Sequence, residues 1–118
     1  MAEQRTGFIQ GVASKENTLV QRAALRSLVQ FAQSRDVQVM IFQGRINPVL
    51  DEEPVLAARV ETARFLHQLG EQEGVTFIPL SEQDVSISAN EWADMTHFDQ
   101  AGREKWTRYL ASYLRGFR

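Results

Sequence analysis

The spacing of apolar residues predicts helices and short strands in alternation along the 118-residue chain. A first helix is expected to begin near Ser14 or Asn17, both of which suit an N-cap, and to end near Asp36. Residues 7–13, just before it, are either a short strand or a loop. The face that this helix buries is expected to carry Leu25, Leu28, Val29 and Ala32.

Two runs of β-branched and aromatic residues predict strands: VQVMIF at residues 37–42 and VTFIPL at residues 75–80. Continuous apolar runs of this length are typical of strands that are covered on both faces of a parallel sheet. Between them, a second helix is expected to begin near Pro54, because proline suits the first helical turn. Its apolar face is expected to carry Leu56, Val60, Ala63 and Leu66.

After the second strand, a polar loop at residues 81–98 leads to a final helix that Asp99 can cap. One face of that helix carries Trp106, Leu110, Tyr113, Leu114 and Phe117. The order of elements predicts an α/β fold with a short parallel sheet flanked by helices, as a partial three-layer α/β/α arrangement. Its sheet has two strands, or three if residues 7–13 pair, which is few for such a fold.

Composition predicts one globular domain over residues 1–118, because 43% of the residues are hydrophobic and 24% are charged. The net charge of -2, with basic and acidic residues interleaved, gives no basic surface for nucleic acid. No apolar run is long enough to span a bilayer, and no targeting signal is recognised, so the compartment stays unassigned. The absence of cysteine excludes disulfides and thiolate ligands, and no cofactor is expected.

The densest polar cluster lies in NEWADMTHFDQAG, residues 90–102, where Asp94 and His97 stand three residues apart. This spacing lets a carboxylate accept a hydrogen bond from one imidazole nitrogen, which fixes the tautomer and leaves the other nitrogen as a general base. The same spacing also occurs in turns and caps. A metal site is not favoured, although Glu91 and Asp99 are near, because no second histidine lies close in the sequence.

The block from Asp94 into the last helix resembles the closing block of SGNH, or GDSL-like, hydrolases. That family has Asp-x-x-His, an apolar residue or proline, a capping residue and a glycine, and this chain has Asp94, His97, Phe98, Asp99 and Gly102 at matching places. The stretch RVETARFLHQLGEQEGVTFIPL is similar to the family's preceding helix and strand. The resemblance covers about residues 17–115, is nearest to cell-envelope proteins of the acyltransfer type, and implies the C-terminal half of that fold.

The chain departs from the family because it has no Gly-Asp-Ser block for a nucleophile and no Gly-x-Asn-Asp block for an oxyanion hole. Ser86 and Ser88 are the nearest substitutes in the loop, but no glycine for an oxyanion hole accompanies them. The resemblance therefore implies that Asp94 and His97 supply part of an ester-hydrolysing or O-acyl-transferring site, inactive by itself. The chain is then either a fragment of a longer parent protein, to which the serine and the acyl-ester substrate would belong, or a short relative that has lost activity.

Two further residues are candidates for substrate binding. Arg45 follows the first predicted strand and is expected either to reach the cleft and hold an anionic group or to be solvated. Trp92 is expected either to form one side of the site or to pack against the protein without a role in binding. The alternative function is a non-catalytic α/β module, in which the open sheet edge beside residues 37–42 pairs with a second copy or a complementary chain.

Overall fold

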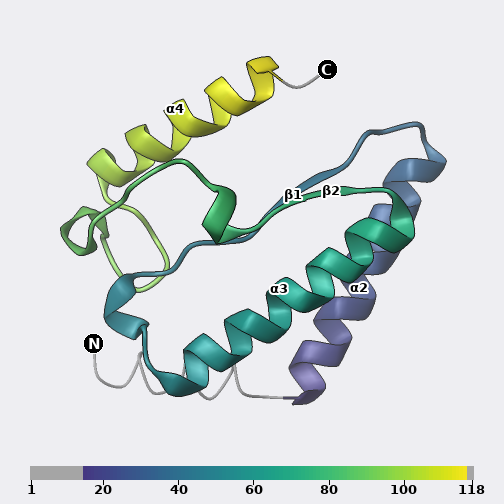
Figure 1. Cartoon of the computed structure of the whole chain (residues 1–118), viewed down its shortest axis with the longest axis horizontal. Coiled ribbons are helices and arrows are strands. Elements are labelled where there is room, and N and C mark those ends of the chain that lie inside the picture. Colours follow the sequence, from purple (N-terminus) through teal and green to yellow (C-terminus); the bar gives the residue numbers. More distant parts are fainter. Residues whose placement is uncertain (1–14, 117–118) are drawn as a thin grey trace. The chain divides into compact units, whose positions relative to one another are not determined.

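The computed structural model of the chain describes residues 15–116, with side chains from residue 18 onward (Figure 1). It contains helices α2 (Lys15–Ser34), α3 (Glu53–Glu73) and α4 (Gln100–Gly116), and strands β1 (Met40–Phe42) and β2 (Thr76–Ile78). Three single 3₁₀ turns are η1 (Pro48–Leu50), η2 (Leu80–Glu82) and η3 (Ala89–Glu91). The predicted α/β class is confirmed. The three-layer arrangement stays a prediction, and residues 7–13, the expected third strand, lie outside the described residues.

Contacts divide the chain into two compact units. Within the described residues, the first unit contains α2, β1, α3 and β2, and the second contains residues 44–51 and 80–116. The expectation of a single domain over residues 1–118 stays a prediction. Across residues 15–116, the helices are too short or too polar to cross a bilayer.

The first unit is built on a parallel β1–β2 pair in which Ile41 lies opposite Phe77. Side chains alternate between the faces of a strand, so these two partners point to the same face of the sheet. Both pack against one apolar core, and helices α2 and α3 lie beside each other on that face (Figure 1). The buried residues of this core are Val29 from α2, Leu66 and Leu69 from α3, and Val75 at the start of β2.

The start and the end of helix α3 are set by Pro54 and Gly74. Pro54 occupies the first turn, as predicted, and Gly74 ends the helix in the left-handed conformation with φ 68°. The amide of Val75 donates to the Gly70 carbonyl at 3.0 Å, which turns the chain into β2. A Cβ on Gly70 would lie 2.8 Å from the Val75 carbonyl oxygen, so this close return requires glycine.

The apolar face predicted for α3 is wrong in its N-terminal half. The side chains of Leu56 and Val60 are 42% and 58% exposed, whereas Val55, Leu66 and Leu69 are buried. Two apolar stripes run along this helix, and packing selects the one that contains Val55. Leu28 of α2 is a second correction, because it is 62% exposed although its spacing placed it with the core residues Leu25 and Val29.

The second unit centres on the entry to α4. The Asp99 carboxylate accepts from the amide of Gly102 at 2.9 Å, which confirms it as the predicted cap. Aromatic rings follow one another along this region, with neighbouring centroids 4.5–6.3 Å apart, in the order Trp92, Phe98, Trp106, Tyr109, Tyr113. On the predicted face of α4, Leu110 is partly buried and Leu114 is 55% exposed, and Phe117 lies outside the described residues.

Candidate functional site

Asp94 and His97 lie in a tight turn that joins Trp92 to Phe98. Those two residues form an isolated antiparallel bridge, and their rings are 4.5 Å apart. Inside the turn, the amides of Ala93 and Asp94 both donate to the His97 carbonyl, at 2.8 and 3.3 Å. These backbone hydrogen bonds hold the two ends of Asp-x-x-His together without any contribution from side chains.

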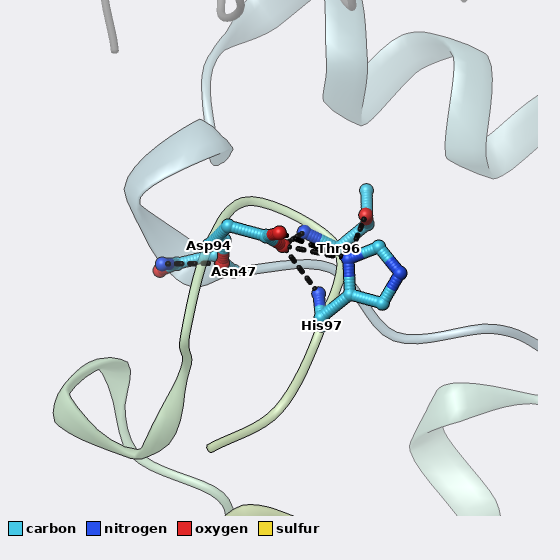
Figure 2. A network of polar contacts seen from close by, with 4 residues as sticks. All are labelled: Asn47, Asp94, Thr96 and His97. Carbon is cyan, nitrogen blue, oxygen red and sulfur yellow. Dashed lines mark hydrogen bonds and ion pairs between the residues drawn. The ribbon is translucent and has the colours of Figure 1, made fainter.

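The Asp94 carboxylate completes the turn and holds the imidazole (Figure 2). Its Oδ1 accepts from the amides of Thr96 and His97, at 2.9 and 2.7 Å. The Nδ1 of His97 lies 2.9 Å from Oδ1 and 3.0 Å from Oδ2 of the same carboxylate. A carboxylate only accepts hydrogen bonds when ionised, so this contact favours the tautomer in which Nδ1 carries the proton. The Nε2 atom is then left as a proton acceptor.

Hydrogen bonds hold the pKa of the Asp94 carboxyl below its ordinary value. The largest contribution comes from the amide of Thr96, and the next from the His97 side chain. Both donors stabilise the charged form. The carboxylate that faces Nδ1 is therefore ionised at neutral pH, as an orienting acid in a proton-transfer site needs to be.

The pair faces solvent. The side chain of His97 is 75% exposed and that of Asp94 is 47% exposed. The imidazole also has the Thr96 hydroxyl 3.2 Å from Nδ1. Among the described residues, no other hydroxyl is hydrogen-bonded to His97. Within residues 15–116, the site thus presents an exposed imidazole that is oriented through Nδ1 and whose Nε2 has no hydrogen-bond partner.

Asn47 anchors the turn from a distant part of the sequence. This residue is 8% exposed and follows β1, which puts it 47 positions before Asp94. Its backbone N–H donates to the Met95 carbonyl at 2.9 Å. Its side-chain Nδ2 donates to the Asp94 carbonyl at 3.4 Å (Figure 2). Its Oδ1 accepts from Val49 at 3.1 Å. Asn47 was not among the site residues predicted from the sequence.

Gly102 lets the first turn of α4 approach the Asp94–His97 turn closely. A Cβ at this position would collide with the Glu91 carbonyl oxygen and would lie 3.0 Å from the Cβ of Phe98. The backbone closes the same contact, because the amide of Asp99 donates to the Glu91 carbonyl at 3.0 Å. Gly102 is part of the block that resembles SGNH hydrolases. In this structure glycine is required there because any side chain would collide with neighbouring backbone.

Ser86 and Ser88, the nearest candidates for a nucleophile, have other contacts. Ser88 caps η3 together with Glu91, whose carboxylate accepts from the Ser88 amide at 3.0 Å and from its hydroxyl at 2.8 Å. Glu91 also binds Lys105 at 2.7 Å, and Lys105 reaches the Ser86 carbonyl at 3.3 Å. These contacts assign Ser88 to a cap rather than to the imidazole.

Arg45 and Trp92 are both engaged with neighbouring groups. The Arg45 guanidinium donates to Oε1 of Gln83 and to the Val85 carbonyl, both at 3.0 Å, and lies 5.9 Å from the Trp106 ring centre. Burial lowers its pKa. Trp92 belongs to the Asp94–His97 turn and packs on Phe98. The structure thus places Trp92 beside the pair, and a role in substrate binding stays a prediction for both residues.

The described residues offer no cluster of three or more histidine, cysteine or acidic side chains that could hold a metal ion. The turn itself presents an ionised carboxylate, an oriented imidazole and backbone amides. His67, the chain's other histidine, lies on α3 with its ring 4.8 Å from Phe77, edge to face.

Comparisons with protein-family models, curated proteins and solved structures find no match. The relationship to SGNH hydrolases therefore stays a prediction, made from the residues of the Asp94–Gly102 block and of the preceding helix and strand.

Proposed function

We propose that Asp94 and His97 are the acid and base of a Ser-His-Asp site for ester hydrolysis or O-acyl transfer. The observation that carries the proposal is the contact of His97 Nδ1 with both carboxylate oxygens of Asp94, at 2.9 and 3.0 Å. In this arrangement Nε2 takes a proton from a serine hydroxyl, and the Asp94 carboxylate stabilises the imidazolium that forms. The imidazolium then returns the proton to the leaving alcohol.

The serine belongs to a segment that this sequence does not supply. The chain lacks a Gly-Asp-Ser block, and Ser88 is bound to Glu91. Exposure of the His97 ring supports a partner segment, because a base that waits for a nucleophile from elsewhere has to be accessible. In this proposal, residues 1–118 are the C-terminal half of an SGNH-type α/β/α fold.

The test is hydrolysis of p-nitrophenyl acetate by the complete natural protein, whatever its length. His97→Ala is expected to lower kcat/KM by about 10³-fold or more, and Asp94→Asn by about 10²- to 10⁴-fold, since base and orienting acid act together. His67→Ala is the matched control, because it removes a histidine from α3 and should leave kcat/KM unchanged. Turnover that survives His97→Ala, or no turnover of any acyl ester, contradicts the proposal.

A spectroscopic measurement tests the pair without requiring turnover. Nitrogen NMR of the 118-residue chain should show His97 protonated at Nδ1 and bare at Nε2 above neutral pH. Asp94→Asn should remove that preference, because an amide can accept from or donate to either tautomer. A mixture of tautomers in the unmodified chain would show that the carboxylate does not orient the ring.

A second candidate, a non-catalytic module that binds a second copy of itself, is favoured by the outward face of α2. Its exposed apolar residues are Val20, Leu28 and Phe31, at 70%, 62% and 59%. At helical spacing, residues 20, 24, 28 and 31 share one side of the helix, opposite to Arg26, which contacts Gln72 and Glu73 of α3. Pairing through the sheet edge, the form expected from the sequence, stays a prediction.

Sedimentation decides between a monomer and this self-association. The module predicts a dimer at micromolar concentration, and Leu28→Glu should shift it to a monomer by placing a charge in the apolar contact. Glu61→Gln on the exposed surface of α3 is the control and should leave the dimer intact. A monomer at all concentrations refutes the module, and it leaves the Asp94–His97 proposal unaffected.

A further inference from the structure

A hollow of about 520 Å³ lies between α4 and the loop that follows η2 in the second unit. The volume is within the range of sites for small molecules. The loop contributes Asp84, Val85 and Ser86, and α4 contributes Lys105, Arg108, Tyr109, Ser112 and Tyr113. We call this the α4 hollow. None of the residues assigned to the proposed reaction, Asp94 and His97, lines it.

The charges of the α4 hollow are not all compensated within the described part of the chain. Lys105 is held by Glu91 at 2.7 Å, so its charge is matched. The side chains of Asp84, from the loop, and Arg108, from α4, make no hydrogen bond or ion pair with any residue between 15 and 116. Opposite charges that share a hollow without pairing with each other are free to bind a ligand that carries both signs.

Neutral groups complete the lining. The hydroxyls of Ser86 and Ser112 can donate or accept, and the rings of Tyr109 and Tyr113 supply apolar walls with centroids 6.1 Å apart. Burial raises the pKa of the Tyr109 phenol, with smaller contributions in the same direction from Tyr113 and Asp84.

We propose that the α4 hollow binds a small zwitterion, an amino acid in chemical class, with its ammonium group on Asp84 and its carboxylate on Arg108. The guanidinium is a planar donor that suits a carboxylate through two parallel hydrogen bonds, and the Asp84 carboxylate accepts from an ammonium. The aliphatic part of the ligand lies against the tyrosine rings. A ligand with a single charge can pair with Asp84 or with Arg108, but not with both.

The test is a titration of the isotopically labelled chain with three ω-amino acids of increasing length: glycine, 4-aminobutyrate and 6-aminohexanoate. Amide and side-chain NMR resonances of Asp84, Ser86, Arg108 and Ser112 should shift with one length preferred, since the ligand has to reach both charged side chains at once. Butyrate and butylamine, each with one charge of 4-aminobutyrate, should bind at least about tenfold more weakly than the preferred zwitterion.

Two variants with matched controls test whether Arg108 binds the carboxylate of the ligand and Asp84 its ammonium group. Arg108→Gln and Asp84→Asn should each weaken the preferred zwitterion about tenfold and remove the advantage over one singly charged probe, butylamine and butyrate respectively. Arg103→Gln, also exposed on α4 but outside the hollow, and Asp51→Asn, an exposed acid in the same unit, should leave the affinity unchanged. A folded spectrum for each variant shows that a loss of binding is local.

Three results overturn the inference. The first is the absence of shifts in the lining residues with all three zwitterions. The second is equal binding of butyrate and 4-aminobutyrate, which would make this a simple anion site without a role for Asp84. The third is equal weakening by Arg103→Gln and Arg108→Gln, which would mean that general charge drives binding. Repeating the titration with His97→Ala separates this site from the proposed acyl-transfer site, because binding should not change.

Discussion

The two compact units of this chain are stabilised in different ways. The first buries a cluster of aliphatic side chains from two helices and a parallel strand pair, around Val29, Leu66 and Leu69. The second combines hydrogen bonds that link loops to the start of α4, through Asn47, Glu91 and Asp99, with the buried side chains of Leu50, Ile87 and Met95 and a series of aromatic rings. Apolar burial contributes to both units, and in the second it is accompanied by polar contacts that hold surface loops in place.

This difference explains where the candidate chemistry lies. A polar turn leaves carboxylate, imidazole and amide groups at the surface, where they can meet a substrate or another segment. An aliphatic core excludes such groups, because a buried charge without a partner is costly. The first unit therefore supplies structure, and every group of the proposed site belongs to the second.

The largest expected effect comes from opening a cavity in the first unit. Leu69 is fully buried, so Leu69→Ala should lower the free energy of unfolding by about 2–5 kcal/mol. Urea denaturation followed by circular dichroism measures this. Val60→Ala, on the exposed side of the same helix, is the control and should change it by less than about 0.5 kcal/mol. Equal effects of the two substitutions would mean that the aliphatic cluster does not stabilise the first unit.

The next effect concerns the tight approach of α4 to the turn. Gly102→Ala should lower the free energy of unfolding by about 1–3 kcal/mol, because the new Cβ collides with the backbone oxygen of Glu91. Gly44→Ala is the matched control, since a Cβ there meets nothing within 4 Å. Thermal melts of both variants give the comparison. A fully stable Gly102→Ala would show that the turn and the helix are not in close contact.

A smaller loss is expected when the polar anchor is removed. Asn47→Ala deletes the side-chain contacts with the Asp94 carbonyl and the Val49 amide, and it should lower the free energy of unfolding by about 1–2 kcal/mol. Amide NMR shifts should change most at residues 93–97, which Asn47 holds through the backbone. Asn90→Ala, at an exposed position, serves as the reference. Shifts confined to residues 47–50 would show that Asn47 does not hold the Asp94–His97 turn.

The smallest effect is a titration in acid. The pKa of Glu91 is lowered from 4.5 to about 2, first by the hydrogen bond from Lys105 and then by the Ser88 amide. Because the folded pKa is the lower one, this carboxylate contributes stability above pH 4.5, and the contribution is lost as pH falls towards 2. Lys105→Met should move the pKa upward towards 4.5, as carboxyl carbon NMR would show. Arg103→Gln should leave it near 2, and a Glu91 pKa near 4.5 in the unmodified chain would contradict the Lys105 contact.

The sequence predicts the elements of both units better than their packing. Pro54, Gly74 and Asp99 act through local chemistry, so the bounds of α3 and the cap of α4 follow from the residues themselves. The strands are shorter than the apolar runs that predicted them, residues 40–42 rather than 37–42 and 76–78 rather than 75–80. Strand ends depend on ladder hydrogen bonds with a partner, which a single apolar run does not encode.

The candidate site divides in the same way. Three-residue spacing is enough to predict the contact between Asp94 and His97, because the turn that joins them is local. Asn47 was missed because its contact spans 47 positions and its only sequence signal, an asparagine before a proline, is shared with ordinary turns. The buried face of α3 was mistaken because apolar residues lie on more than one side of this helix, and only tertiary packing distinguishes buried Val55 from exposed Leu56 and Val60.

The aromatic series at the entry to α4 has a consequence for spectroscopy. Both tryptophans of the chain, Trp92 and Trp106, belong to the second unit, and each has another aromatic ring within 5.3 Å. Tryptophan emission is therefore a reporter for that unit alone, while far-ultraviolet ellipticity is dominated by α2 and α3 as well as α4. Overlaying the two signals during denaturation shows whether the units unfold in one cooperative step or in two.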